Sequence, residues 1–257
     1  MSSHIKKIAV YGKGGIGKST TVSNVSCALA KMGYKVMQIG CDPKSDSTGN
    51  LQNGRRIPTI LHTIMEKGEE TKLEDIVFIG DSGVICAEAG GPTPGKGCAG
   101  KGIVTAFEKL NELDAYEVYK PDIVIYDVLG DVVCGGFAMP LRNGYADEVY
   151  IVTSGEKMSI YAANNIIEAA RGFQETSDLQ IGGLILNGKN IAKEKEAVEE
   201  FSEEIEVPIV ANIPRCDLIQ QAEDQYKTVN FLYPDSEQAQ IYAQLAQVMA
   251  KGIEKSL

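Results

Sequence analysis

The sequence predicts an α/β fold built on a doubly wound, mostly parallel β-sheet. Short, nearly continuous apolar runs recur along the chain, which is typical of strands covered by helices on both faces. Amphipathic stretches of helical period separate these runs, and the alternation indicates right-handed βαβ units. Ligands of such sheets bind at the carboxyl ends of the strands, so the residues that carry chemistry are expected there.

Predicted strands and helices alternate along the chain. The strands are the apolar runs 8–11, 35–39, 84–86, 123–127, 148–153, 181–187 and 208–211. The helices are the amphipathic stretches 18–32, 102–113, 158–171, 193–203 and 236–255. Residues 90–102 are rich in glycine and are predicted to form a loop. Because no repeat or linker interrupts the pattern, we expect a single domain over residues 1–257.

Composition narrows the classes of function. The chain has 257 residues, 44% hydrophobic and 23% charged, so it can bury one sizeable core. Its formal net charge of -10 would repel a phosphate backbone, and we expect no nucleic-acid partner. No apolar run approaches the roughly 18 residues of a membrane span, and the N-terminus lacks the apolar region of a signal peptide. The sequence thus predicts a cytoplasmic protein without membrane association.

A phosphate-binding loop follows the first predicted strand. Residues 12–19 fit the pattern G-x-x-x-x-G-K-[ST] between a strand and a helix, the context that this motif requires. Lys18 would neutralise the β- and γ-phosphates and Ser19 would ligate Mg²⁺. The motif predicts a P-loop NTPase with ATP and Mg²⁺ as cofactors, the alternative being a Gly-rich turn with an exposed lysine. The predicted nucleotide-binding residues are Gly12, Lys13, Gly14, Gly15, Ile16, Gly17, Lys18, Ser19 and Thr20.

Lys13, directly after the first glycine of the loop, adds a second cation. Its position resembles the deviant Walker A signature of a dimeric ATPase family, in which this lysine reaches the nucleotide of the partner subunit. Such a lysine acts like an arginine finger, since it adds charge only when two subunits close on the γ-phosphate. The resemblance implies that Lys13 is catalytic together with Lys18, and that nucleotide state and dimer geometry are coupled.

Aspartates after two predicted strands complete a hydrolysis site. An aspartate that ends an apolar strand in a P-loop protein normally supports Mg²⁺ through the water ligands of the ion rather than binding it directly, and Asp127 takes that role. Asp42, after the second strand, is the candidate for positioning the attacking water, which makes it both catalytic and nucleotide-binding. Asp131 is a further catalytic candidate, although Asp46 and Asp131 could instead cap the segments that follow them.

Two of the six cysteines, Cys98 and Cys134, lie among glycines and other small residues. An iron-sulfur cluster needs thiolate ligands, and glycine flanks let backbone N–H groups approach the sulfur atoms. No C-x-x-C pair exists, which argues against a cluster or zinc site held within one chain. Two thiolates from each subunit of a two-fold homodimer would supply the four ligands of a 4Fe-4S cluster.

Five segments resemble the nitrogenase iron protein family, and the similarity extends over essentially the whole chain. They are residues 11–21, 40–48, 90–102, 126–140 and 161–166. The resemblance implies an ATP-hydrolysing iron-sulfur oxidoreductase that passes single electrons from an intersubunit cluster, bound by Cys98 and Cys134, to a partner metalloprotein. It implies a homodimer, a nitrogenase-like catalytic component and a low-potential donor such as ferredoxin. Segments 42–48 and 127–131 would act as switches between nucleotide and cluster.

Further positions take their roles from the same resemblance. Cys86 corresponds to a family cysteine that lies near the cluster without ligating it, whereas the remaining cysteines are interpreted as small buried or loop residues. The residues that resemble the family's adenine-side contacts are Asn187, Pro214, Arg215 and Gln238. For Asn187, which ends a strand, the capping of a turn is an equal alternative.

Two departures from the family bear on the client protein. Lys101 stands where nitrogenase iron proteins usually carry an arginine, so docking charge is kept while Arg-specific modification is not expected. The chain ends at Leu257, without the C-terminal extension of those proteins. We therefore expect the client to be the reductive cyclase of a nickel tetrapyrrole coenzyme of methanogenesis, with dinitrogenase and protochlorophyllide or chlorin reductase as alternatives.

A rival class is the partitioning or septum-positioning ATPase, which shares the deviant P-loop but has no cluster. It would need a basic surface or a cationic amphipathic helix at the C-terminus. The last predicted helix has few basic residues, and its apolar spacing is that of a packed helix. An iron-sulfur scaffold ATPase would carry a C-x-x-C near its C-terminus, and none is present.

Overall fold

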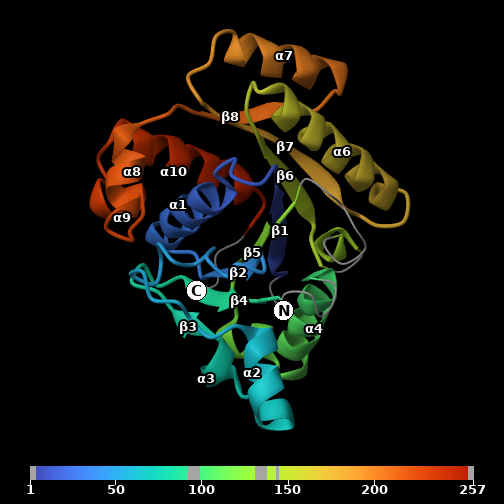
Figure 1. Ribbon diagram of the computed structural model, residues 1–257, viewed down its shortest axis with the longest axis vertical. Coiled ribbons are helices and arrows are strands. Elements are labelled where there is room, and N and C mark those ends of the chain that lie inside the picture. Colours follow the sequence, from blue (N-terminus) through green and yellow to red (C-terminus); the bar gives the residue numbers. More distant parts are fainter. Residues whose placement is uncertain (1–3, 92–98, 131–137, 143–144, 254–257) are drawn as a thin grey trace.

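The computed structural model describes residues 4–91, 99–130, 138–142 and 145–253 (Figure 1). Within these residues, one sheet orders its strands β3-β4-β2-β5-β1-β6-β7-β8. The bounds are β1 Lys6–Tyr11, β2 Val36–Cys41, β3 Phe78–Ile79, β4 Ile85–Glu88, β5 Ile123–Val128, β6 Glu148–Thr153, β7 Gln180–Asn187 and β8 Ile209–Ile213. Each pairing between these strands is parallel except that of β3 with β4, so the predicted doubly wound, mostly parallel sheet is confirmed.

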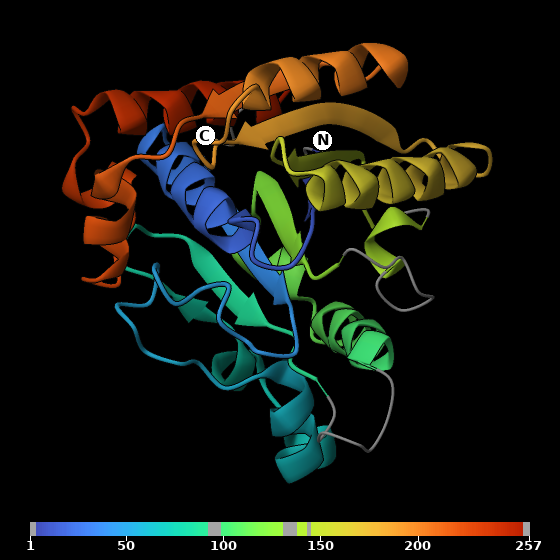
Figure 2. The same cartoon turned by 45° about the horizontal axis from the view of Figure 1, so that its top comes forward.

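Helices cover both faces of the sheet, as Figures 1 and 2 show. Helices α1, α8, α9 and α10 pack on one face, and α4, α6 and α7 pack on the other. The bounds are α1 Lys18–Lys31, α2 Ile60–Lys67, α3 Leu73–Ile76, α4 Ala99–Glu112, α5 Ala115–Tyr119, α6 Lys157–Gln174, α7 Glu194–Glu204, α8 Asp217–Glu223, α9 Val229–Leu232 and α10 Glu237–Met249. Short 3₁₀ turns lie at Gly68–Glu70 and Met139–Leu141.

Strand β5 shows why the apolar runs of the sequence are continuous. Ile123 and Ile125 contribute to the core beneath α1 and α10, whereas Val124 and Tyr126 contribute to the core beneath α4 and α6. All four side chains are fully buried. A central parallel strand that is buried on both faces needs apolar residues at every position, which removes the polar alternation of a half-exposed strand.

The element boundaries correct three expectations. Helix α4 begins at Ala99, inside the predicted loop 90–102. Gly102, which suggested a loop, lies within the helix and allows close packing, since a Cβ there would lie 3.1 Å from Leu61 Cδ2. Helix α10 ends at Met249 rather than residue 255, and Gly252 follows with a positive φ of 86°. The short elements α2, α3, α5, α8, α9 and β3 were not predicted, since a few residues carry too little period to be recognised.

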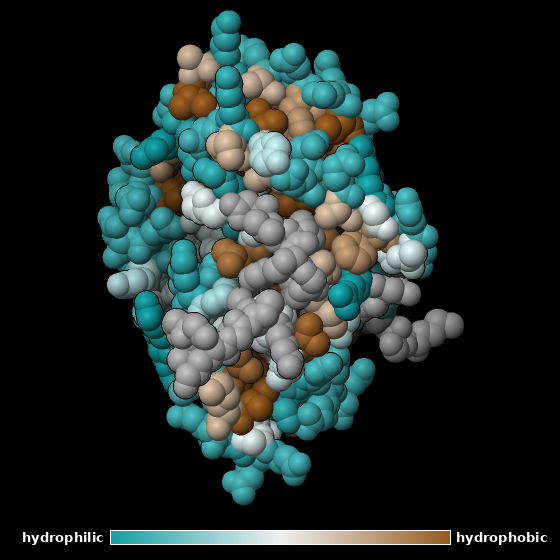
Figure 3. Space-filling view, turned by 45° about the vertical axis from the view of Figure 1, so that its right-hand side comes forward, coloured by the Kyte–Doolittle hydropathy of each residue, from teal (hydrophilic) through white to brown (hydrophobic). Residues whose placement is uncertain are grey.

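The surface is largely hydrophilic, in keeping with the net charge of -10. Figure 3 shows one face that is mostly hydrophilic at its upper and lower ends, with small apolar patches scattered over it. Two large apolar side chains that reach the surface, Met158 and Tyr161, belong to α6. Among the described residues, no helix combines the length and the apolar character that crossing a membrane requires.

Candidate functional site

The loop between β1 and α1 has a backbone shape that only glycine allows at two positions. Gly12 has φ 148°, and a Cβ there would lie 2.3 Å from the carbonyl oxygen of Val152. Gly17 has φ 102°, and its Cβ would lie 2.4 Å from Asn187 Nδ2. These close approaches hold the loop against β6 and β7, and an isolated bridge pairs Gly12 with Gly130 after β5. The motif glycines therefore set the position of the loop over the sheet.

A pocket of about 290 Å³ opens above this loop. Its walls come from the loop, from the start of α1 and from the segments after β2 and β5: Gly14, Gly15, Gly17, Lys18, Ser19, Thr20, Asp42, Lys44, Asp46 and Leu129. Helix α1 begins without a side-chain cap, which leaves its first-turn N–H groups for an anionic ligand. Lys18 is only 7% exposed, so its charge is directed into this pocket rather than to bulk solvent. The pocket suits a polyphosphate.

Asp127 lies at the end of β5 behind this pocket and is 2% exposed. Neither of its carboxylate oxygens makes a well-formed hydrogen bond to the described residues. Burial raises the pKa of Asp127 above its ordinary value, while the nearby Lys18 and the hydroxyls of Ser19 and Ser47 act to lower it. A buried carboxylate that makes no well-formed hydrogen bond, beside serine hydroxyls and a phosphate pocket, has the chemistry of a Mg²⁺ site. The residues present therefore fit MgATP.

The segment 42–48 runs from the end of β2 along the same pocket. Asp42 Oδ1 accepts the N–H of Lys44 at 2.8 Å, which orients the carboxylate beside the loop. At the other end, Gln38 Nε2 donates to both the carbonyl oxygen and the hydroxyl of Ser47 at 3.0 Å. The exposed Asp46 lines the pocket between these two anchors.

Glu88, which the motifs did not single out, ends β4 and is fully buried next to this segment. Its Oε1 accepts both the N–H of Thr48 at 2.8 Å and the hydroxyl of Thr48 at 2.7 Å. Burial raises the pKa of Glu88 to about 8, and the charges of Asp127 and Asp46 act in the same direction. One sequence signal was present: an acidic residue that ends an apolar run, as Asp127 does.

A second pocket, of about 440 Å³, opens on the other side of the loop. Two of the predicted adenine-side residues, Asn187 and Arg215, line it, while the exposed Pro214 and the buried Gln238 do not. Asn187 Nδ2 also donates to the carbonyl oxygen of Ile16 at 2.6 Å. The side chain of Asn187 thus braces the phosphate loop and faces the second pocket at once.

Other residues of the second pocket were missed from the sequence. They include Lys189, Cys216, Asp217, Gln220, Glu223 and Tyr242. Glu223 Oε1 accepts the hydroxyl of Thr20 at 2.5 Å, and Lys189 Nζ donates to the carbonyl oxygen of Ile16 at 3.2 Å. No local pattern marks these positions, because they come together only when β7, α8 and α10 meet beside α1.

The remaining predicted residues are less fully described. Lys13 is half-buried and does not line the phosphate pocket of its own chain. Asp131, Cys98 and Cys134 lie outside the described residues. Cys86 is fully buried, and burial raises the pKa of its thiol to about 12, which keeps it a neutral thiol rather than a metal-binding thiolate.

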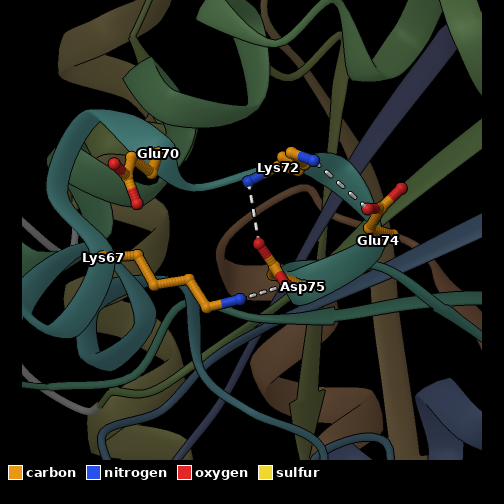
Figure 4. A pocket seen from close by; sticks show the side chains of 5 residues that line it. All are labelled: Lys67, Glu70, Lys72, Glu74 and Asp75. Atoms are coloured by element: carbon orange, nitrogen blue, oxygen red, sulfur yellow. Dashed lines mark hydrogen bonds and ion pairs between the residues drawn. The ribbon is translucent and has the colours of Figure 1, made fainter.

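A third pocket, of about 520 Å³, shares no lining residue with the first two (Figure 4). Its walls are Lys67, Glu70, Lys72, Glu74 and Asp75. Figure 4 shows Lys67 and the backbone N–H of Lys72 pointing at Asp75. Lys67 Nζ donates to Asp75 Oδ1 at 2.5 Å, and the N–H of Lys72 donates to Asp75 Oδ2 at 3.0 Å. The charges of this pocket are exposed and largely paired with one another, so it resembles a solvated surface hollow rather than a ligand site.

Comparison with known proteins matches residues 6–255 to the family described as 4Fe-4S iron sulfur cluster binding proteins, NifH/frxC family. The nitrogenase iron protein of Methanospirillum hungatei is 54% identical over 246 residues, covering 95% of this chain and 87% of that protein. Nitrogenase iron protein 2 of Paenibacillus durus is 48% identical, covering 100% and 88% respectively. The septum site-determining protein MinD of Pyrococcus horikoshii has a similar structure, with a TM-score of 0.74 and 22% identity, covering 96% of this chain and 97% of that one.

Proposed function

The chain belongs to this family of 4Fe-4S cluster binding proteins, and from that premise we propose that it is an ATP-dependent reductase that delivers single electrons to a partner metalloprotein. A 4Fe-4S cluster and MgATP are the cofactors of the family. The observation that supports its ATP-dependent part is Asp127, buried behind the phosphate pocket with no well-formed hydrogen bond to the described residues. Cys134 follows it by seven residues, so one short segment would join the nucleotide site to a cluster ligand.

Each group at the phosphate pocket has a proposed task. Lys18 and the first-turn N–H groups of α1 bind and orient the phosphates. Ser19 would ligate Mg²⁺ and Asp127 would support the ion through its water ligands, and Mg²⁺ would supply positive charge to the transferring phosphoryl group. Asp42 is proposed to orient the attacking water. The P-loop motif and its strand-end aspartates are the parts of an ATP-hydrolysing site, in which water takes the phosphoryl group, so we propose that ATP serves to change protein conformation rather than to phosphorylate a substrate.

Lys13 is proposed to act across a homodimer. It does not line the phosphate pocket of its own chain, so a role in trans is compatible with its place. Replacing Lys13 with Ala is expected to leave the fold unchanged and to slow ATP hydrolysis. Raising the protein concentration should not restore the rate once dimers have formed. Unchanged hydrolysis by that variant would exclude the role in trans.

The proposed cluster ligands are Cys98 and Cys134, two from each subunit. The cluster, when bound, supplies a one-electron donor. The test is to purify the protein without oxygen and to measure iron per dimer together with visible and EPR spectra. About four irons per dimer, lost in Cys98→Ser and in Cys134→Ser, are expected. An iron-free protein that hydrolyses ATP after anaerobic reconstitution would instead favour a positioning ATPase, whose fold this chain shares.

Two clients are proposed, and different observations favour each. The resemblance of residues 1–40 favours a nickel tetrapyrrole reductive cyclase. The names of the relatives, which are nitrogenase iron proteins at 45% to 54% identity, favour dinitrogenase. Reduction assays of the loaded protein with each purified client component, with ferredoxin as donor, distinguish the two, because only the correct partner will stimulate ATP hydrolysis.

A further inference from the structure

Glu88 is a buried acid for which hydrolysis of ATP supplies no evident task. It ends β4, it is 0% exposed, and its Oε2 makes no hydrogen bond to the described residues. An acid in this setting costs free energy that an apolar residue of similar size would avoid. Its two hydrogen bonds go to a single residue, Thr48, at the end of the nucleotide-facing segment 42–48.

The neighbouring strand is shaped to hold this carboxylate. Gly40 pairs with Glu88 in the register of β2 and β4, and a Cβ at Gly40 would lie 1.9 Å from Glu88 Oε2. The same Cβ would lie 2.7 Å from Ser47 Cβ. Only a glycine leaves room for the Glu88 side chain to reach across β2 and meet the segment 42–48.

The residues that follow Glu88 contact this segment and the strand that leads into it. The N–H of Ala89 donates to the carbonyl oxygen of Gly40, in β2, at 2.8 Å. Gly91 lies against Pro43, since a Cβ at Gly91 would be 2.6 Å from Pro43 Cβ. Residues 88–91 therefore contact the segment 42–48 near both of its ends, and they lead in sequence toward Cys98.

We propose that Glu88 is a positioning residue that couples the nucleotide-facing segment 42–48 to the end of β4. When ATP draws Asp42 and its neighbours toward the phosphates, Thr48 moves with them, and its two hydrogen bonds carry the displacement to residues 88–91. This path runs through the end of β4, whereas the switch segment 127–131 follows β5. It rests on the proposed use of ATP and adds a link from the nucleotide pocket to residues 88–91, which precede Cys98 in the sequence.

Hydrogen–deuterium exchange of the full-length protein tests this coupling without using electron transfer. Exchange is measured with and without MgATP in peptides that cover residues 42–50 and 85–91. In the wild type, MgATP is expected to slow exchange in both peptides. Glu88→Met removes the acceptor of both hydrogen bonds, and Thr48→Val removes the hydroxyl donor. In each variant, the slowing of exchange by MgATP should fall by about tenfold in peptide 85–91 and persist in peptide 42–50.

Two variants serve as controls. Glu88→Gln keeps an oxygen that can accept both bonds from Thr48, and it should retain the response of residues 85–91. Thr71→Val removes a comparable buried hydroxyl, whose hydrogen bond to the carbonyl oxygen of Gly68 is 2.8 Å long. Thr71 does not line the nucleotide pockets, so this variant should behave as the wild type. Thermal unfolding of every variant identifies any that fails to fold.

The outcomes separate this inference from the proposed function. A wild-type response at 85–91 in both Glu88→Met and Thr48→Val would overturn the coupling and leave ATP use intact. A wild type in which MgATP slows exchange at 42–50 only would do the same. A wild type that shows no nucleotide response in either peptide would overturn the coupling together with the proposed use of ATP.

Discussion

The two ends of the nucleotide site are built in different ways. The phosphate end comes mainly from one contiguous loop, and the groups around it, Lys18 and Asp127, are nearly fully buried. The second pocket collects residues from α1, β7, α8 and α10, and Arg215 is exposed to solvent there. Ligand affinity at the buried phosphate end should depend strongly on each charged side chain. At the open second pocket, affinity should be shared among many weak contacts.

The difference also shows in how the loop is supported. At the phosphate end, Asp127 lacks a hydrogen-bond partner among the described residues. On the other side, Asn187 and Lys189 already donate to the carbonyl oxygen of Ile16. Binding of MgATP would therefore give the Asp127 carboxylate a partner at the phosphate end, and would compete with existing hydrogen bonds at the second pocket. Substitutions at the two ends should thus change ATP affinity by different amounts.

The largest effect is expected for Lys18→Met. Removing a buried cation from a phosphate site should weaken ATP binding by about 100-fold, measured by calorimetry or by displacement of a fluorescent nucleotide. Lys189→Met, at the other end, removes a lysine of the second pocket and should change affinity much less. Equal losses in the two variants would contradict the proposed division of the site.

Asp127→Asn should lower Mg²⁺-dependent hydrolysis by about 10- to 100-fold, because it weakens the support of the metal. The same change should raise the thermal stability of the nucleotide-free protein, since burial raises the pKa of Asp127 and the neutral amide avoids that desolvation cost. Steady-state hydrolysis with varied Mg²⁺ and thermal unfolding measure the two effects. A destabilised, fully active variant would contradict the assignment.

Glu88 should make stability depend on pH at the phosphate end. Burial raises the pKa of Glu88 from 4.5 to about 8, so its contribution to stability is fully present below pH 4.5 and is lost as the pH rises through 8. The slope is at most about 1.4 kcal/mol per pH unit over this window. Denaturant unfolding from pH 5 to 9 should show a smaller fall in Glu88→Gln than in the wild type. Parallel curves would show that Glu88 does not titrate there.

A small effect is expected for Asn187→Ala. This variant loses one hydrogen bond to the carbonyl oxygen of Ile16, while Lys189 still donates to the same oxygen. ATP affinity should therefore fall by about fivefold. Measuring the affinity of this variant for ATP and for inorganic triphosphate separates a contact with the base from support of the phosphate loop. If Asn187 contacts the base, only ATP binding will weaken; if it only braces the loop, both will weaken equally.

The smallest effect is expected at the third, exposed pocket. Lys67→Ala and Asp75→Ala break an ion pair whose members are paired with each other at the surface. ATP affinity and hydrolysis should stay within about twofold of the wild type. A larger loss would show that this hollow communicates with the nucleotide site.

Much of the fold followed from apolar runs alone. Strand β6 was predicted with its observed bounds, because a central parallel strand is buried on both faces and residues 149–152 between its polar ends form a continuous run of apolar and aromatic side chains. The two-residue strand β3 and the four-residue helix α3 were not predicted, since their place depends on the edge of the sheet and not on a local pattern. The single domain and the roles of the site residues stay predictions.

The sequence by itself determined the phosphate loop, the aspartates at strand ends and the family. These features are local: glycines at set spacings dictate a backbone shape, and an acidic residue after an apolar run lies at the carboxyl edge of a sheet. Tertiary structure alone decided that Asn187 contacts Ile16 and that Glu88 contacts Thr48. Both contacts depend on the order of strands in the sheet, which places β4 beside β2 and brings β7 to the loop after β1.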